Sequence, residues 1–179
     1  MICTMIDLET MGTGPNAAIC AIGAVKFDPD AEPSSDGYFY KHVSLSSSQR
    51  TGGTIDADTV EWWLRQSGGA RSALTNELDA VSIEDALFSL DLFHRWERCG
   101  LVWAAPANFD IPIIESAFQR CRLRIPWDRK DVRCWSTLRN VLGIPKEPNT
   151  CEHHALEDAK AQVAAFRKGW AKLKASGLL

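Results

Sequence analysis

The stretch ICTMIDLET, residues 2–10, carries the pattern that decides the fold. Its first part, residues 2–8, is apolar on both faces, which is typical of a central strand covered on each side. Asp7 and Glu9 are two residues apart, and side chains at that spacing on a strand point to the same face. The stretch therefore predicts a buried central strand whose end presents two neighbouring carboxylates.

Four further segments have the composition of strands. Residues 19–27 form an apolar, β-branched run that closes at Asp28, and residues 38–45 make a weaker strand after a turn-rich segment. Residues 101–105 are a short fourth strand, and residues 131–135 are a fifth that runs into a helix ended by Gly143. These segments predict a five-stranded sheet.

Apolar residues at helical spacing lie between these strands and after them. One helix begins at Asp58 and ends at Gly68-Gly69, another has Ser82 as its N-cap, and a third follows Asn108. The chain has no repeats and no linker, so residues 1–179 predict a single domain with a mixed α/β sheet. The last helix is the most regular, with an apolar stripe of Ala159, Val163, Phe166, Trp170 and Leu173.

The two carboxylates at the end of the first strand carry a cost from desolvation and mutual repulsion. A hard divalent cation, which prefers oxygen ligands, would remove that cost for Asp7 and Glu9. Strand ends also shed acids into loops, so this pair alone leaves both a metal site and ordinary surface acids open.

Two more acidic signals lie far along the chain. Asp110 follows the fourth strand, where it is either a functional acid or a helix N-cap in competition with Asn108. Asp158 lies in the first turn of the last helix, where an acid also stabilises the helix dipole. His153 and His154 precede it, and ordinary surface histidines would explain them as well.

The charge of the chain is unevenly distributed. The formal net charge of −3 does not favour a nucleic-acid binder. Between residues 120 and 139, however, seven basic residues stand against two acids, a local balance of about +5 that favours a polyanion. A solvated face or a subunit contact would explain the same segment. Its basic residues are Arg120, Arg122, Arg124, Arg129, Lys130, Arg133 and Arg139.

The composition indicates a cytoplasmic protein without membrane contact. No apolar run approaches the roughly 18 residues of a membrane-spanning helix, and we expect no secretion signal because the first residues show neither a basic leader nor a cleavage site. The six cysteines form no CxxC pair, which argues against a zinc ribbon and favours a reduced compartment.

The acids and the histidine together form a pattern that is more specific than any of its parts. Asp7, Glu9, Asp110 and Asp158, with His153 five residues before the last acid, resemble the motifs of the DEDDh (DnaQ-like) 3′-5′ exonucleases over nearly the full chain. Segments 54–66, 107–110 and 131–133 are most similar to the phage exodeoxyribonuclease VIII-like enzymes and to the exoribonuclease AS group.

This resemblance implies a fold and a chemistry. The fold would be RNase H-like: a five-stranded mixed sheet with an antiparallel second strand and helices on both faces. The four acids would hold two Mg²⁺ or Mn²⁺ ions about 4 Å apart, one activating the attacking water and one stabilising the leaving 3′ oxygen. His153 would be the general base, because histidine titrates near neutrality.

The choice of His153 over His154 depends on the resemblance. Helical geometry favours His154, which is four residues from Asp158 and shares its face, whereas His153 would be offset by about 140°. The family places its histidine five residues before the aspartate, on the loop that leads into the helix, where helical register does not apply. We therefore predict His153.

The resemblance also implies contacts with the terminal nucleotide. Thr10 and Met11, just after Glu9, would line its pocket, although Met11 fits a packing role as well. Trp62 lies off the apolar face of its helix and is the stacking candidate, whereas Trp63 shares that face and is expected in the core. Asn108 and Arg133 are the further candidates, Arg133 as a phosphate contact.

The function that these residues predict is a metal-dependent 3′-5′ exonuclease that releases nucleoside 5′-monophosphates from single-stranded DNA or RNA. An RNA-specific trimming enzyme is one alternative, and a non-catalytic nucleic-acid-binding domain is another. An endonuclease of the RNase H type shares the fold, but the final histidine and aspartate favour an exonuclease. The choice between DNA and RNA stays open because no motif encodes a preference for the 2′-hydroxyl. A homodimer stays open too.

Overall fold

A computed structural model describes residues 1–75, 79–96, 100–148 and 153–178. Its centre is a five-stranded sheet in the order β3-β2-β1-β4-β5. Strand β2 runs antiparallel to both of its neighbours, whereas β4 and β5 run parallel to β1. The predicted mixed sheet with an antiparallel second strand is confirmed. Its strands are β1 (Cys3–Thr10), β2 (Ile19–Phe27), β3 (Gly37–His42), β4 (Leu101–Ala104) and β5 (Val132–Cys134).

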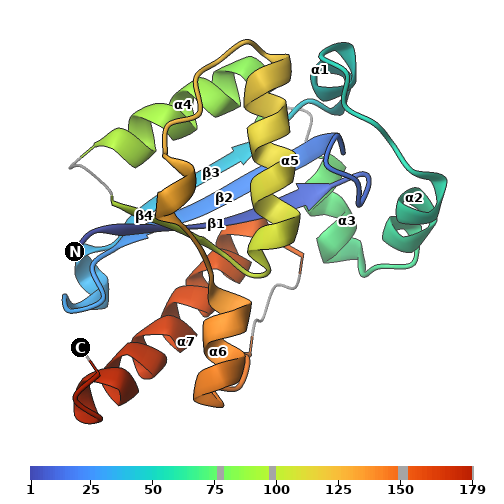
Figure 1. The fold of residues 1–179 in the computed structure, drawn as a ribbon. Helices are drawn as coiled ribbons and strands as arrows, with labels where there is room; N and C mark the ends of the chain where they lie inside the picture. The colour runs from blue at the N-terminus through green and yellow to red at the C-terminus, as the bar shows by residue number, and fades with distance from the viewer. Residues whose placement is uncertain (76–78, 97–99, 149–152, 179) are drawn as a thin grey trace.

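Helices cover both faces of the sheet, as predicted (Figure 1). Helices α4 (Ile83–Arg95) and α5 (Ala107–Arg120) lie over one face, and α6 (Trp135–Leu142) and α7 (Ala155–Ala175) lie over the other. Strand β1 supplies both layers by alternation. Ile6 packs in the core beneath α4 and α5, and Met5 packs with Trp135 and Phe166 on the opposite side. Asp7 and Glu9 share the parity of Met5, so both carboxylates face the α7 side.

Three short helices lie beyond the end of the sheet at which β1 terminates (Figure 1). They are α1 (Leu45–Arg50), α2 (Ala57–Leu64) and α3 (Gly68–Thr75). The prediction that Gly68-Gly69 ends the helix from Asp58 was wrong, because α2 already stops at Leu64 and the two glycines open α3. The third strand is also shorter than expected, since the Ser44 side chain caps α1. Two 3-10 turns lie within the described residues, at Pro33–Ser35 and Arg129–Asp131.

The helix starts show which capping signals were read correctly. Ser82 caps α4 as predicted, and its Oγ accepts from the backbone N–H of Asp85 at 3.1 Å. Neither Asn108 nor Asp110 caps α5, because Pro106 occupies that position and both residues lie inside the first turn. Asp110 is therefore free to accept a hydrogen bond from another element.

Within the described residues, no helix combines the length and apolar character needed to cross a membrane.

Helix α7 approaches β2 so closely that only glycine fits between them. Gly23 pairs with Asp7 across the sheet, and a Cβ at Gly23 would overlap the backbone of Ala155 and Leu156 in the first turn of α7. Backbone atoms inside a helix cannot move aside as a flexible side chain can. This contact sets the height of the first turn of α7 above the sheet.

We expect Gly23→Ala to lower the free energy of unfolding by about 1–3 kcal/mol or more, the usual cost of overpacking a core. Urea unfolding followed by tryptophan fluorescence measures this loss. Gly14→Ala is the matched control, because nothing lies within 4 Å of a Cβ at Gly14. Equal stability of the two variants would contradict the close approach.

Candidate active site

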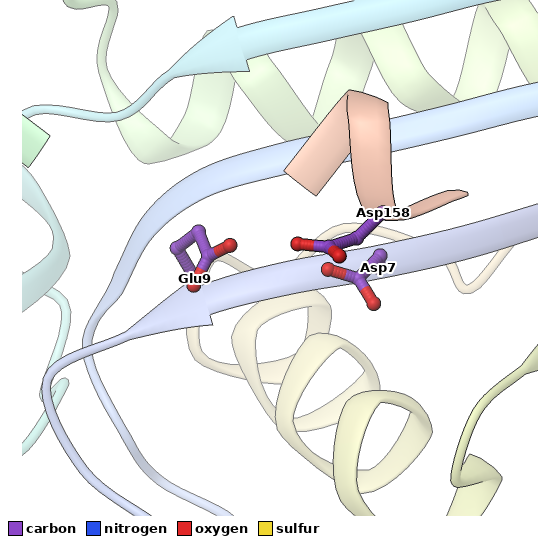
Figure 2. A group of neighbouring side chains, drawn as sticks. All are labelled: Asp7, Glu9 and Asp158. Carbon is purple, nitrogen blue, oxygen red and sulfur yellow. The ribbon is translucent and has the colours of Figure 1, made fainter. Parts of the chain in front are cut away.

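Three carboxylates from two distant segments converge at the end of β1. Asp7 and Glu9 come from β1, and Asp158 comes from the first turn of α7 (Figure 2). One carboxylate oxygen from each residue lies within 4.8 Å of the others. Figure 2 shows the Asp158 side chain beside that of Asp7, both over β1. The close approach of α7 to β2 brings Asp158 within reach of the two strand carboxylates.

Asp110 of α5 is the fourth acid of the same cavity. It is buried, and its Oδ1 accepts a hydrogen bond from the backbone N–H of Leu8 at 3.1 Å. That bond ties the first turn of α5 to the strand between Asp7 and Glu9. The cavity has a volume of about 440 Å³. The structure thus brings all four predicted acids to one cavity, with three of them in close contact.

Burial and mutual repulsion disfavour the negative charge of these carboxylates. Burial, followed by the charges of Asp158 and Asp110, raises the pKa of Glu9 to about 8. Burial raises the pKa of Asp110 to about 7. Burial and the neighbouring acids also raise the pKa of Asp7 well above its ordinary value.

The residues around the cluster fit a cation. Among the described residues, no lysine or arginine forms an ion pair with Asp7, Glu9 or Asp110. Asp7 is bound instead by a neutral amide, since Gln162 Nε2 donates to its Oδ1 at 2.7 Å. A set of oxygen ligands without a cationic side chain is what a hard divalent ion prefers. Asp7, Glu9 and Asp158, with Asp110, are the residues that could hold one.

The two adjacent histidines point in different directions. His153 lies on the turn before α7, with a left-handed φ of +62°, and lines the carboxylate cavity. His154 is the N-cap residue of α7, and its ring stacks on Tyr40 of β3 at a centroid distance of 4.3 Å. His154 does not line the cavity. Only His153 is placed beside the acids.

A second pocket, with a volume of about 640 Å³, adjoins the carboxylates. Glu9 and Phe109 line both hollows. Trp62 and Trp63 of α2 form its aromatic wall. The Trp62 and Trp63 rings meet the His153 ring edge-on at 4.8 and 5.8 Å. Trp63 is buried as predicted, and its indole N–H donates to the Thr10 carbonyl at 3.0 Å, whereas Trp62 is 40% exposed.

The remaining predicted contacts divide into two groups. Thr10 lines the aromatic pocket, and its hydroxyl donates to the Gly12 carbonyl at 2.7 Å. Met11 lines neither hollow. Asn108 and Arg133 line a separate depression, so the structure does not bring them to the acids. Their contacts with a substrate stay predictions.

Sequence reasoning missed several polar residues of the carboxylate cavity, among them Gln162, Arg139 and Lys146. Gln162 was detectable, because it lies four residues after Asp158 and shares its helix face. Arg139 was counted only as part of the basic segment. Lys146 lies after α6 and carried no signal that distinguished it from any exposed lysine.

Solved structures of exonuclease I share this fold. The E. coli exonuclease I complex with a dT13 oligonucleotide superposes with a TM-score of 0.65 at 13% identity, covering 97% of this chain and 42% of that chain. A product-bound exonuclease I structure gives a TM-score of 0.61 at 13% identity, over 97% of this chain and 43% of that chain. The chain therefore has the RNase H-like fold of the DEDDh exonucleases.

A family match over most of the sequence defines the chain more closely. Residues 3–170 match the 3′-5′ exoribonuclease Rv2179c-like domain. The protein belongs to this family.

A curated relative supports the same assignment from a different source. The exodeoxyribonuclease of Enterobacteria phage T4 is 29% identical over 121 residues, which are 62% of this chain. The match covers 52% of the phage protein, so the chain spans about half the length of that relative. The expected likeness to DEDDh exonucleases, including a phage exodeoxyribonuclease, is confirmed.

The raised pKa values predict how stability depends on pH. Unfolded carboxyl groups titrate near pH 4, whereas the pKa values of native Asp110 and Glu9 are about 7 and about 8. The stabilising effect of their protonation is complete below the unfolded pKa and is lost as the pH rises through the folded one. Without divalent ions, we expect the free energy of unfolding to fall as the pH rises from about 5 to about 8.5.

Urea unfolding in chelator at those two pH values measures the fall, and Glu9→Gln should make it shallower because the amide does not titrate. Adding Mn²⁺ at the higher pH should stabilise the original protein more than this variant. Parallel pH profiles for the two proteins would show that Glu9 does not carry the effect.

Proposed function

We propose that the chain is a metal-dependent 3′-5′ exonuclease that acts on single strands in the cytoplasm and releases nucleoside 5′-monophosphates. The observation that carries this proposal is the cluster of Asp7, Glu9 and Asp158 beside an aromatic pocket. Glu9 is buried, and no lysine or arginine among the described residues pairs with Asp7 or Glu9. Family membership and the fold support the same activity.

The four acids are proposed to hold two divalent ions, Mg²⁺ or Mn²⁺. Such ions would supply an activated water and would stabilise the negative charge on the leaving 3′ oxygen. The protein's own part is to fix the ligands. Gln162 orients Asp7 through its hydrogen bond, and Leu8 orients Asp110 through its backbone N–H. Both bonds restrain carboxylates that would otherwise turn away from each other.

His153 is proposed to take the proton of the attacking water. Its ring lines the carboxylate cavity and rests edge-on against Trp62 and Trp63, which limits its rotation. The same tryptophans wall the adjoining pocket. A base bound in that pocket would therefore contact the tryptophan rings that hold His153 in place.

The aromatic pocket is proposed to hold the terminal nucleoside. Trp62 offers a half-open ring face, and Phe109 lies at the border with the carboxylates. Stacking on aromatic rings binds single-stranded bases with little sequence preference. The exonuclease I neighbour was solved with a dT13 oligonucleotide, which supports a single-stranded substrate.

Both nucleic acids are candidate substrates. The matched family is described as exoribonucleases, whereas the phage relative is an exodeoxyribonuclease. The homodimer stays a prediction that no contact in one chain tests.

A panel of end-labelled strands tests the activity. DNA and RNA, single and double, are incubated with Mg²⁺ or Mn²⁺. We expect stepwise shortening of 5′-labelled single strands, release of 5′-monophosphates, and no cleavage when the 3′ hydroxyl is blocked. Asp158→Asn should abolish the reaction. Cutting of a circular single strand would instead show an endonuclease.

The two histidines provide an internally matched test of the proposed general base. We expect His153→Ala to lower kcat by about 10²–10⁴-fold, the usual contribution of general base catalysis, with little change in metal affinity. His154→Ala, which removes the stack on Tyr40, should keep most of kcat. A loss confined to the second variant would reverse the assignment.

A further inference from the structure

Two cationic side chains lie in the carboxylate cavity although neither neutralises a carboxylate there. Arg139 of α6 and Lys146, which follows α6, line the hollow that contains Asp7 and Asp158. Within the described part of the chain, neither cation forms an ion pair. The Arg139 Nε is buried and has no hydrogen-bond partner, and its Nη2 makes only a 3.5 Å contact with Asn140.

A buried guanidinium nitrogen without a partner costs free energy unless a ligand completes it. Guanidinium groups match phosphate in both charge and geometry. Because Arg139 lines the cavity, a phosphate bound there would supply the missing acceptor.

Two other arginines of the basic segment have partners away from the carboxylate cavity. Arg133 donates to the backbone carbonyls of Lys130 and Val132, and Arg120 donates to Ser116. Of the seven basic residues between 120 and 139, all in the described part, only Arg139 lines the carboxylate cavity. Arg139 is therefore the one basic residue of this segment that can contact a ligand in the carboxylate cavity.

Positions along β1 order the groups of the cleft. Thr10 lines only the aromatic pocket, and Glu9 lines both hollows. Asp7 lines only the carboxylate cavity, whose wall continues to Trp135, a core neighbour of Met5, and to Arg139. The sequence of features is aromatic pocket, carboxylates, and then Arg139.

We propose that Arg139, with Lys146, binds the phosphate on the 5′ side of the scissile one, in the strand that remains after each cleavage. The inference rests on the proposed function. With the terminal nucleoside in the aromatic pocket and the scissile phosphate at the carboxylates, the strand leaves past Arg139. Because this contact exists only when a second phosphate is present, the site favours oligonucleotides over mononucleotide esters.

The test compares two substrates and two variants. One substrate is a single-stranded oligonucleotide, and the other is a nucleoside 5′-(4-nitrophenyl phosphate), which carries the scissile phosphate alone. We expect Arg139→Gln to lower kcat/KM for the oligonucleotide by about 10- to 100-fold, the range for a lost charged hydrogen bond, and to leave the ester within about twofold. The control Arg95→Gln changes an exposed arginine of α4 that lines neither hollow, and it should alter neither rate.

Two further measurements make the test specific. An oligonucleotide with an uncharged methylphosphonate at the second linkage from its 3′ end should be cleaved as slowly by the original protein as the normal strand is by Arg139→Gln. The Arg139→Gln variant should cleave this modified oligonucleotide no more slowly than the original protein does. The slope of log KM against log salt should also decrease by about 0.7, the contribution of one phosphate contact on a single strand.

Each result decides the matter. An equal loss of kcat/KM on the ester and the oligonucleotide would show that Arg139 acts at the scissile phosphate or stabilises the fold. Normal cleavage of the methylphosphonate strand would show that the second phosphate is not bound. Either outcome overturns the proposal. If the original protein cleaves neither substrate, the proposed function fails on its own. Weaker binding of a fluorescent strand by Arg139→Gln than by Arg95→Gln would then still support the subsite, and equal binding would overturn it.

Discussion

Repulsion among the acids at the end of β1 is the constraint on which the site depends. Two unit charges about 5 Å apart cost about 3 kcal/mol at the effective dielectric constant of a protein surface, a large share of the 5–15 kcal/mol that stabilises a typical domain. The contact of α7 with Gly23 nevertheless holds Asp158 against Asp7 and Glu9. The fold thus keeps its acids at a separation that a divalent cation would make favourable.

The sequence predicted the elements better than their ends. Residues 19–27 were placed without error because an apolar, β-branched run leaves little choice of structure. Gly68-Gly69 was misread as a stop because glycine is compatible with either end of a helix, and the position of Pro106 before α5 was overlooked. The four acids were found from a family pattern. Their convergence could not follow from local rules, because it depends on how closely α7 packs on β2.

Arg139 and Lys146 were missed because the tertiary fold brings them to the acids, and no interval in the sequence indicates it. Arg139 looked like one of seven similar cations, and Arg133 was chosen because it follows a strand. In the structure Arg139, not Arg133, lines the carboxylate cavity, and Arg133 donates to backbone carbonyls. The adjacent histidines make the same point. His154 has the better helical register with Asp158, but the left-handed turn at His153 directs that ring to the acids instead.

The arrangement also gives the cleft a direction. Trp62 and Trp63 wall one end, where they contact His153, and Arg139 lies on the carboxylate side, away from the aromatic wall. An aromatic pocket holds a terminal base without reading its identity, whereas a cation holds a phosphate that every internal nucleotide carries. A site with this order of groups would bind the terminal base of a strand and, beyond the scissile phosphate, the next phosphate of the strand that remains after cleavage. Under the proposed function, the shortened strand would present the same terminal base and internal phosphate after each release, so that the recognition would repeat one nucleotide further along.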